Sequence, residues 1–249
     1  RSTGLGPKDT AHVSVDAAGK IEVLTGGASL GQGFETTMAQ ICAEAIGVDY
    51  RLVTVIHGQT NLIADGIGAH ASRATVMTGS AVNEAACNLR GRLLDEAARL
   101  LQAPVASLDI VDGVVVTRGN DAGPSIALGK IAALVGRVSA EGTFRTEHMT
   151  YPFAVHLAQV AIDKETGEVK VERFAVAYDI GRSVNPMMVE GQIQGGYAQG
   201  LGGALYEEFL YDANGAPLCV TLADYLLPSS CEVAAVETLV LEDSPTDRN

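Results

Sequence analysis

Glycine is the feature that most constrains this fold, because 28 of the 249 residues are glycine in a chain that is 47% hydrophobic and has no tryptophan. These glycines do not form a flexible linker, since they fall at the ends and on the faces of segments with regular hydrophobic patterns. Glycine is needed where main chain comes close to a ligand or to another helix. A chain that uses it this often is expected to be built around something large.

The charge and hydropathy of the chain exclude two classes of partner. The formal net charge of −13 argues against binding to nucleic acid or to an anionic membrane surface. No run of about 18 apolar residues is present to span a bilayer, and there is no basic-then-apolar leader of the secretory kind. A cytoplasmic protein without nucleic-acid or membrane partners is therefore expected.

Four cysteines are present, and no two of them have the spacing of metal ligands: Cys42, Cys87, Cys219 and Cys231. Cys42 and Cys87 fall on the apolar faces of predicted helices, where a cysteine behaves as a small buried hydrophobe. Nothing in the spacing requires a disulfide framework or an iron–sulfur cluster. The pattern fits a reducing compartment.

The first half of the chain alternates between the periodicities of strands and helices. Strands are predicted at 12–16, 21–25, 52–57, 110–111 and 114–116, and helices at 35–46, 79–101 and 126–135. The polar segment 137–150 has no strong periodic signal, so it is taken to separate two domains, 1–140 and 141–249.

The second half repeats this mixture of elements. Strands are predicted at 155–162, 169–176 and 233–241, a glycine-rich helix at 188–208, and a hairpin turn at 212–215. Many connections are hairpins rather than helical crossovers. The fold class is therefore predicted to be α+β, with mixed sheets, helices packed on them, and two related α/β subdomains.

The first candidate site is the loop Gly31-Gln32-Gly33, directly before a predicted helix. The amides of a helix N-terminus bind anions or oxo groups, and flanking glycines let a ligand come close. Gln32 adds an amide that both donates and accepts hydrogen bonds. The simpler interpretation, a glycine loop that merely turns into a helix, is favoured by the residues alone.

The second candidate is Ala71-Ser72-Arg73, with Thr75 close behind. Small side chains, one hydroxyl and one guanidinium suit a phosphate or a polar ring system, with Arg73 supplying charge. The alternative interpretation is a serine or threonine that caps the following helix.

The third candidate is the glycine-rich segment 191–203, which contains Gln192, Gln194 and Gln199. Glycines four residues apart let a helix pack closely against a neighbour, and the glutamines argue against a lipid span. The alternative is a tightly packed helix whose glutamines face water. Asp179 and Asn185 are expected to brace the preceding turn, and the five histidines show no metal-ligand spacing.

Taken in order, these segments resemble the molybdopterin-binding region of the large subunit of the molybdenum hydroxylases, the xanthine dehydrogenase and aldehyde oxidase family. The matches are collinear and run from about residue 10 to residue 249. They comprise Gly31-Gln32-Gly33 with Thr36, Gln40, Ala71-Ser72-Arg73 with Thr75 and Gly79, Tyr151-Pro152-Phe153, Asp179-Ile180-Gly181, Asn185-Pro186, Glu190-Gly191-Gln192, Gly195-Gly196 and Gln199-Gly200-Leu201-Gly202.

The resemblance implies a molybdenum–molybdopterin (pyranopterin) cofactor bound by both domains. Gln32, between Gly31 and Gly33, would hydrogen-bond an oxygen ligand of molybdenum. The main chain around Ala71, Ser72 and Arg73 would hold the metal end and the pterin, and Gln199 would bond the pterin. The reaction implied is hydroxylation of an aldehyde or N-heterocycle with water-derived oxygen, with carbon monoxide left open as a substrate. The cofactor supplies the redox chemistry and the protein supplies orientation.

One family feature is not found. The glutamate of a Gly-Glu pair, the general base in this family, is expected beyond Asn249, so no catalytic residue is assigned. Residues 243–249 resemble the approach to that loop, and the second domain is expected to be truncated there. The chain alone is expected to be inactive and to hold the cofactor weakly, because several segments share it.

The resemblance implies further partners: the remaining large-subunit domains, iron–sulfur and FAD modules, and a small-molecule substrate. The high hydrophobic fraction also predicts self-association. The alternative hypotheses are a non-catalytic cofactor-binding or assembly module that lacks the catalytic glutamate, and an unrelated glycine-rich scaffold.

Overall fold

The computed structural model describes residues 8–64, 66–120, 122–146 and 151–242. The chain divides into two compact units, Arg1–Met149 and Thr150–Asn249, here called the first and second units. Each unit has its own sheet and its own helical layer, and each is described by itself.

The first unit is built on a four-stranded sheet with the order β3-β2-β1-β7. Its strands are β1 (Lys8–Val15), β2 (Ile21–Thr25), β3 (Val53–Ile56) and β7 (Val138–Arg145). β1 pairs antiparallel with β2 and β7, whereas β2 pairs parallel with β3. Along β1, Val13 and Val15 are buried on one face and His12 is exposed on the other. The sheet thus has one covered face and one solvent face, as expected for period-two alternation.

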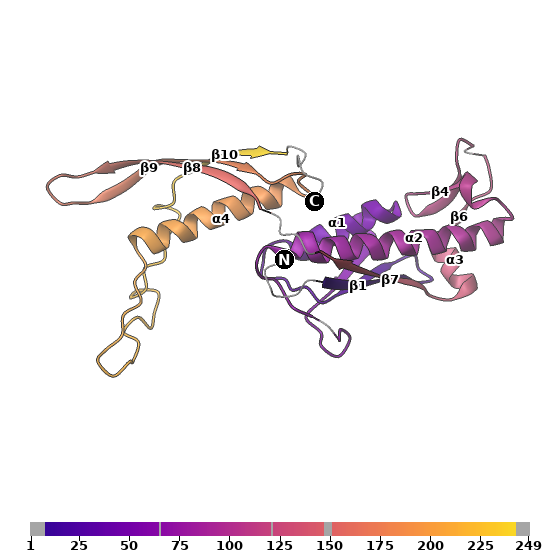
Figure 1. The fold of residues 1–249 in the computed structure, drawn as a ribbon, viewed down its shortest axis with the longest axis horizontal. Helices are drawn as coiled ribbons and strands as arrows, with labels where there is room; N and C mark the ends of the chain where they lie inside the picture. Colours follow the sequence, from indigo (N-terminus) through magenta and orange to yellow (C-terminus); the bar gives the residue numbers. More distant parts are fainter. Residues whose placement is uncertain (1–7, 65, 121, 147–150, 243–249) are drawn as a thin grey trace. The chain divides into compact units, whose positions relative to one another are not determined.

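Two helices, α1 (Phe34–Ile46) and α2 (Gly79–Leu101), run side by side along the covered face of this sheet (Figure 1). Their apolar residues recur every three or four positions and enter one core with the sheet. The fully buried positions include Met38, Cys42 and Ile46 on α1 and Val82, Ala85, Ala86, Leu89 and Leu93 on α2. Both helices are confirmed close to their predicted bounds.

A second, smaller sheet lies near the carboxyl end of α2 (Figure 1). It contains β4 (Leu108–Val111), β5 (Val114–Thr117) and β6 (Ile126–Ala127), and α3 (Leu128–Val135) follows. The predicted tight hairpin is confirmed, with φ angles of 47° at Asp112 and 78° at Gly113. The predicted helix at 126–135 begins two residues later, because residues 126–127 pair with β5. Short 3-10 turns at Tyr50–Leu52 and Val105–Ser107 precede β3 and β4.

The segment 137–150, which has no strong periodic signal and is predicted to separate the two domains, contains a strand: β7 occupies Val138–Arg145 and pairs with all of β1. Its inward positions include Ala140 and Gly142, which are too small to give a hydrophobic signal. At Gly142 the small size is required by α2, which lies directly against it: an added Cβ would sit 2.2 Å from the amide nitrogen of Ala85. The strand therefore belongs to the first unit. Residues 147–150 lie outside the described part of the chain.

The burial predicted for Cys42 is confirmed, whereas that predicted for Cys87 is wrong. Cys42 is buried in the core and Cys87 is exposed on α2. The buried face of α2 is set by Ala85, Ala86 and Leu89, and position 87 lies about 100° of helix rotation past position 86, toward solvent.

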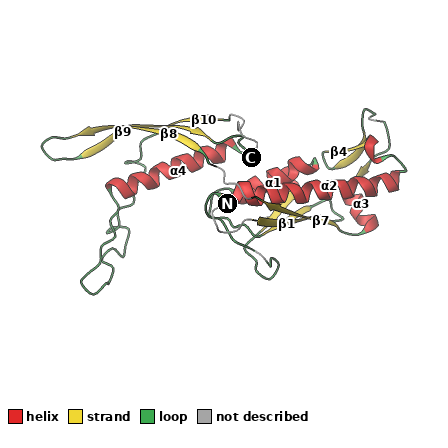
Figure 2. Cartoon of the chain, viewed as in Figure 1, coloured by secondary structure: helices red, strands yellow, loops and turns green. Residues whose placement is uncertain are grey.

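The second unit pairs a three-stranded sheet with one helix (Figure 2). The sheet order is β10-β9-β8, from β8 (Phe153–Ile162), β9 (Val169–Asp179) and β10 (Val236–Leu241). β9 is antiparallel to β8 and parallel to β10. The helix α4 (Pro186–Leu205) covers one face, where the rings of Phe174 and Tyr197 stack at 4.2 Å. The predicted α+β class with mixed sheets is confirmed.

The other face of this sheet carries exposed apolar side chains. Phe153, Val155 and Leu157 on β8 are 63–71% exposed. Strand pairing places Val155 opposite Ala177 and Ala177 opposite Leu239, and directly paired residues share a face. We call this surface the open sheet face: Phe153, Val155, Leu157, Leu239 and Leu241.

Candidate functional site

The two candidate loops of the first unit meet where α1 and α2 begin. The amide of Gly68 donates to the carbonyl of Gly26 at 3.1 Å, which ties the loop before α2 to the loop before α1. Close packing reinforces this, since a Cβ added at Gly27 would clash with the Phe34 ring and contact Thr78. Loops that are separate in the sequence therefore form one end of the first unit.

The first loop ends in a helix N-terminus that carries no side-chain cap in the described structure. Gly33 is the N-cap of α1 with φ of 78°, and Gly31 has φ of 94°, both in the left-handed region that favours glycine. The amides of the first turn of α1 therefore face outward from the loop without a capping oxygen from the N-cap residue. Such a terminus attracts anionic or oxo groups.

Gln32 is folded back onto its own loop. Its Oε1 accepts from the Leu30 amide at 2.6 Å, and its Nε2 donates to the Ala28 carbonyl at 3.1 Å. Both ends of the side-chain amide are thus used to hold the loop. A ligand that engaged this amide would compete with these two bonds.

A polar cluster beside this loop was not predicted from the sequence. His57 Nε2 lies 3.0 Å from Glu35 Oε1, and Ser29 Oγ donates to Glu35 Oε2 at 2.8 Å. The hydrogen bond with His57 is the main reason that the pKa of Glu35 is lowered. The His57 ring also meets Phe34 edge to face at 5.4 Å. His57 lies 22 positions from Glu35, so no local spacing could have indicated the pair.

The second loop presents main chain rather than charge. Ala71 and Ser72 are exposed, with φ angles of 49° and 55°. The Arg73 side chain is only 5% exposed and pairs with Asp9 at 3.1 Å. The guanidinium that residue type alone suggested as a ligand group is therefore used inside the protein. A π-helical turn, Ala74–Thr78, then leads into α2, and such turns often mark functional sites.

Two nitrogen atoms of this loop are buried without a hydrogen-bond partner among the described residues, His70 Nε2 and Arg73 Nε. Buried polar groups are normally satisfied, and each exception needs an explanation. Together with the exposed main chain of Ala71 and Ser72, the Arg73 Nε–H donor suits a polar, anionic group, and His70 Nε2 donates or accepts according to its tautomer. The residues present therefore fit a cofactor such as molybdopterin at this end of the first unit.

In the second unit, Gln199 lies exposed on α4. The predicted bracing of the preceding turn is confirmed, since Asn185 is the N-cap of α4 and accepts from the Met188 amide at 3.1 Å. Asp179 likewise accepts from the Gly181 amide at 3.3 Å.

The close packing expected of the α4 glycines is not found in the described structure. A Cβ added at Gly191, Gly195, Gly196, Gly200 or Gly203 would meet no described atom within 4 Å. Only Gly202 is closely covered, by Glu207 and Pro228. Gln192, Gln194 and Gln199 are exposed, as expected for glutamines facing water.

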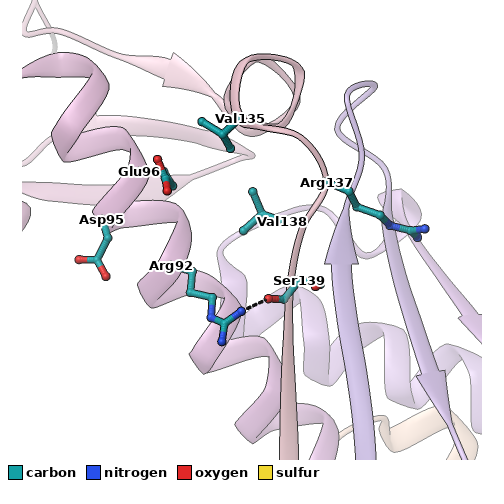
Figure 3. A pocket seen from close by; sticks show the side chains of 7 residues that line it. All are labelled: Arg92, Asp95, Glu96, Val135, Arg137, Val138 and Ser139. Atoms are coloured by element: carbon teal, nitrogen blue, oxygen red, sulfur yellow. Dashed lines mark hydrogen bonds between the residues drawn. The ribbon is translucent and has the colours of Figure 1, made fainter.

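A separate shallow pocket of about 350 Å³ lies between the carboxyl half of α2 and the start of β7 (Figure 3). It is lined by residues of both charges, including Arg92, Asp95 and Arg137. Arg92 donates to the Ser139 carbonyl at 2.6 Å, and Arg137 is bonded to Ser14 and Glu22. Position 92 lies roughly 20 Å along the axis from the start of α2, so the pocket is separate from the candidate loops.

The described residues contain no cluster of three or more His, Cys, Asp or Glu side chains arranged to hold a metal ion. None of the described helices is long and apolar enough to cross a membrane. The approach to the expected glutamate loop, 243–249, lies outside the described residues.

Comparison with known proteins decides the family. The profile described as "Molybdopterin cofactor-binding domain" matches residues 2–234, nearly the whole chain. This chain belongs to the molybdopterin cofactor-binding domain family. The resemblance of the sequence motifs to the molybdenum hydroxylases is thereby confirmed.

Named relatives support this membership at the level of sequence. The chain is 38% identical to the 6-hydroxypseudooxynicotine dehydrogenase complex subunit gamma of Paenarthrobacter nicotinovorans, over 99% of the chain and 32% of that protein. It is 33% identical to the carbon monoxide dehydrogenase large chain of Hydrogenophaga pseudoflava, over 94% of the chain and 30% of that protein. The chain thus spans about a third of the length of these relatives.

A solved structure supports the fold. Quinoline 2-oxidoreductase from Pseudomonas putida 86 matches with a TM-score of 0.82 at 35% identity, covering 96% of this chain and 32% of that one. The fold of this molybdopterin cofactor-binding domain therefore matches about a third of that longer chain.

Proposed function

We propose that this domain holds the molybdenum–molybdopterin cofactor of a hydroxylating oxidoreductase. The observation that carries the proposal is the Gly68–Gly26 hydrogen bond, which brings the loops around Gln32 and Ser72 to one end of the first unit. Family membership supports the identity of the cofactor.

The proposed holding residues act through main chain and neutral amides. The amides near Gly31 and Gly33 and the Gln32 side chain would meet the metal end. The main chain of Ala71, Ser72 and Arg73 would hold the metal end and the pterin, and Gln199 of the second unit would bond the pterin. When bound, the cofactor supplies the redox chemistry of oxygen transfer from water to carbon.

We propose an aldehyde or an N-heterocycle as the substrate. The names of relatives favour the second class, since quinoline 2-oxidoreductase and the nicotine 6-hydroxylase large subunit of Paenarthrobacter nicotinovorans both act on nitrogen rings by name. A hydrogen-bonding site discriminates strongly between such rings and isosteres without the nitrogen.

Catalysis is proposed to belong to a larger assembly. Relatives are named as subunits of complexes, and the chain spans about a third of their length. The remaining large-subunit domains and iron–sulfur and FAD modules are the proposed partners. The open sheet face supports this, because contiguous exposed apolar surface marks interaction sites.

Cofactor retention tests the proposal. The chain would be purified from cells that make molybdopterin, and molybdenum and oxidised pterin would be measured per chain. We expect molybdenum and pterin in equal amounts, at less than one per chain because the chain alone is expected to hold the cofactor weakly. Gln32→Ala is expected to lower the content at least about two- to tenfold, since it removes a hydrogen bond to the cofactor and also the two bonds by which Gln32 holds its loop.

Asn83→Ala, on the exposed side of α2, is the matched control and is expected to retain the wild-type content. A wild-type chain without molybdenum and pterin would contradict cofactor binding by this domain. Bound cofactor with sustained turnover of an aldehyde or quinoline by this chain alone would contradict the expectation that the general base lies beyond Asn249.

A further inference from the structure

Two consecutive exposed residues of the second loop have an unfavourable main-chain conformation. Ala71 and Ser72 have φ angles of 49° and 55°. This left-handed region is costly for residues with a Cβ, because that atom crowds the neighbouring carbonyl. Such a conformation persists only where the surrounding structure enforces it, and it is concentrated at functional sites.

The side chain of Arg73 closes the turn that contains these residues. Nη1 donates to the Gly68 carbonyl at 3.3 Å and Nη2 donates to the Lys8 carbonyl at 3.1 Å. The Arg73 amide itself donates to the His70 carbonyl at 3.1 Å. One guanidinium thus links the start of the turn, its end and strand β1.

Asp9 fixes the position of that guanidinium. Its Oδ2 accepts from Arg73 Nη1 at 3.1 Å and from Thr78 Oγ1 at 2.6 Å, and its Oδ1 accepts from the Thr10 amide at 2.9 Å. The Asp9 and Arg73 side chains are 4% and 5% exposed. A buried ion pair is a poor source of net stability compared with apolar side chains. Its effect here is to fix the position of the Arg73 guanidinium, which in turn bonds the Gly68 and Lys8 carbonyls.

We infer that Asp9 and Arg73 form a positioning pair, which holds the main chain of Ala71 and Ser72 in the conformation that the cofactor meets. The inference rests on the proposed function of this loop. Neither residue needs to touch the cofactor through its side chain. Because the Gly68 amide is bonded to Gly26, the pair also holds this loop against the one that carries Gln32.

Amide hydrogen exchange of the cofactor-free chain tests the positioning directly. Arg73→Lys keeps the charge that Asp9 requires, but its one ammonium nitrogen cannot occupy the positions of both Nη1, which bonds Asp9 and Gly68, and Nη2, which bonds Lys8. Within the peptide covering 69–73, the amide with a described hydrogen bond is that of Arg73, which donates to the His70 carbonyl. Its exchange is expected to be at least about tenfold faster than in the wild type, from loss of a buried charge-assisted bond. Exchange in the α1 and α2 cores is expected to be unchanged.

Two further variants separate positioning from general destabilisation. Thr78→Val removes one partner of Asp9 and is expected to raise exchange at 69–73 by less than Arg73→Lys. Glu22→Gln breaks the exposed Glu22–Arg137 pair elsewhere in the sheet, which has a separation of 2.7 Å, and is expected to leave 69–73 unchanged. Unchanged exchange at 69–73 in a folded Arg73→Lys, or an equal rise throughout the chain, would overturn the inference.

Cofactor content distinguishes this inference from the proposed function. If the wild type retains molybdenum and pterin, Arg73→Lys is expected to retain several-fold less while its unfolding midpoint stays near that of Glu22→Gln. Wild-type content in Arg73→Lys despite faster local exchange would overturn the role toward cofactor. A wild-type chain that holds no cofactor would reject the proposed function instead, whatever the exchange data show.

Discussion

Gly142 on β7 lies directly against the main chain of α2 at Ala85, where an added Cβ would sit 2.2 Å from the amide nitrogen. It would also lie 2.6 Å from the Ala81 carbonyl oxygen. Both neighbours are helix backbone, which cannot move aside as a side chain can. This contact sets how closely α2 approaches the sheet.

Gly142→Ala is therefore expected to lower the free energy of unfolding by about 2 kcal/mol, the usual cost of overpacking a core. Urea unfolding followed by circular dichroism measures it. Gly91→Ala on α2 is the control, because a Cβ there meets nothing within 4 Å, and it is expected to stabilise by up to about 1 kcal/mol. Equal effects of the two substitutions would contradict the close approach.

The cysteines are expected to differ in reactivity. Burial raises the pKa of the Cys42 thiol to about 12, and the thiolate is the reactive form. At pH 8, iodoacetamide is expected to modify exposed Cys87 and Cys231 while leaving Cys42 intact until the chain is unfolded. Peptide mass spectrometry measures the modification. Alkylation of Cys42 as fast as Cys87 in the folded chain would contradict the burial of Cys42 in the core.

The Glu35–His57 pair is expected to make a small, pH-dependent contribution to stability. Because the folded pKa of Glu35 is lowered from the ordinary 4.5, mainly by the bond with His57, its stabilisation is present above pH 4.5 and lost as the pH falls through the lower folded value. Glu35→Gln is expected to destabilise by under about 1 kcal/mol near neutral pH, since the carboxylate is half exposed.

Unfolding free energies at pH 7 and at acid pH test this contribution, with Glu44→Gln on the exposed side of the same helix as the control. The gap between wild type and Glu35→Gln is expected to narrow on acidification. If the difference in unfolding free energy widened on acidification instead, the pKa of Glu35 in the folded chain would be raised and not lowered.

The open sheet face is expected to drive self-association of the chain. Leu157 on this face is 66% exposed, so Leu157→Lys removes apolar area and adds charge without entering a core. Light scattering across a concentration series is expected to show less association for this variant. Val111→Lys, at the exposed end of β4 in the first unit, is expected to leave association as in the wild type. A concentration-independent monomer in the wild type would count against the role of this face.

Much of the fold is predictable from the sequence, because most elements obey one periodicity. The strand at β8, the helix ending at Ile46 and the hairpin at Asp112-Gly113 each follow local rules that need no knowledge of the rest of the chain. β7 does not, since glycine at its inward position 142 is required by the close approach of α2, which is separated from it in the sequence. Exposure of Cys87 similarly depends on which face of α2 meets the sheet.

The candidate site divides in the same way. Glycines before a helix indicated the Gln32 loop, and small residues indicated the Ser72 loop. No spacing rule connects Arg73 to Asp9, which are 64 positions apart, or indicates that the arginine faces inward. The sequence motifs therefore locate the loops, whereas the three-dimensional structure is needed to show which partners each side chain contacts.

Six glycines in α4, Pro186–Leu205, have a thermodynamic consequence. Each is less favourable in a helix than alanine by about 0.8–1.0 kcal/mol, roughly 5 kcal/mol in all. At five of them an added Cβ would meet no described atom within 4 Å, so no close approach in the described structure requires glycine there. Helix formation here is expected to be linked to ligand occupancy. A ligand that binds only the helical form, present at 100 times its Kd, adds about 2.7 kcal/mol. The melting temperature of the second unit would then rise with ligand concentration, and this dependence would give the affinity for the ligand.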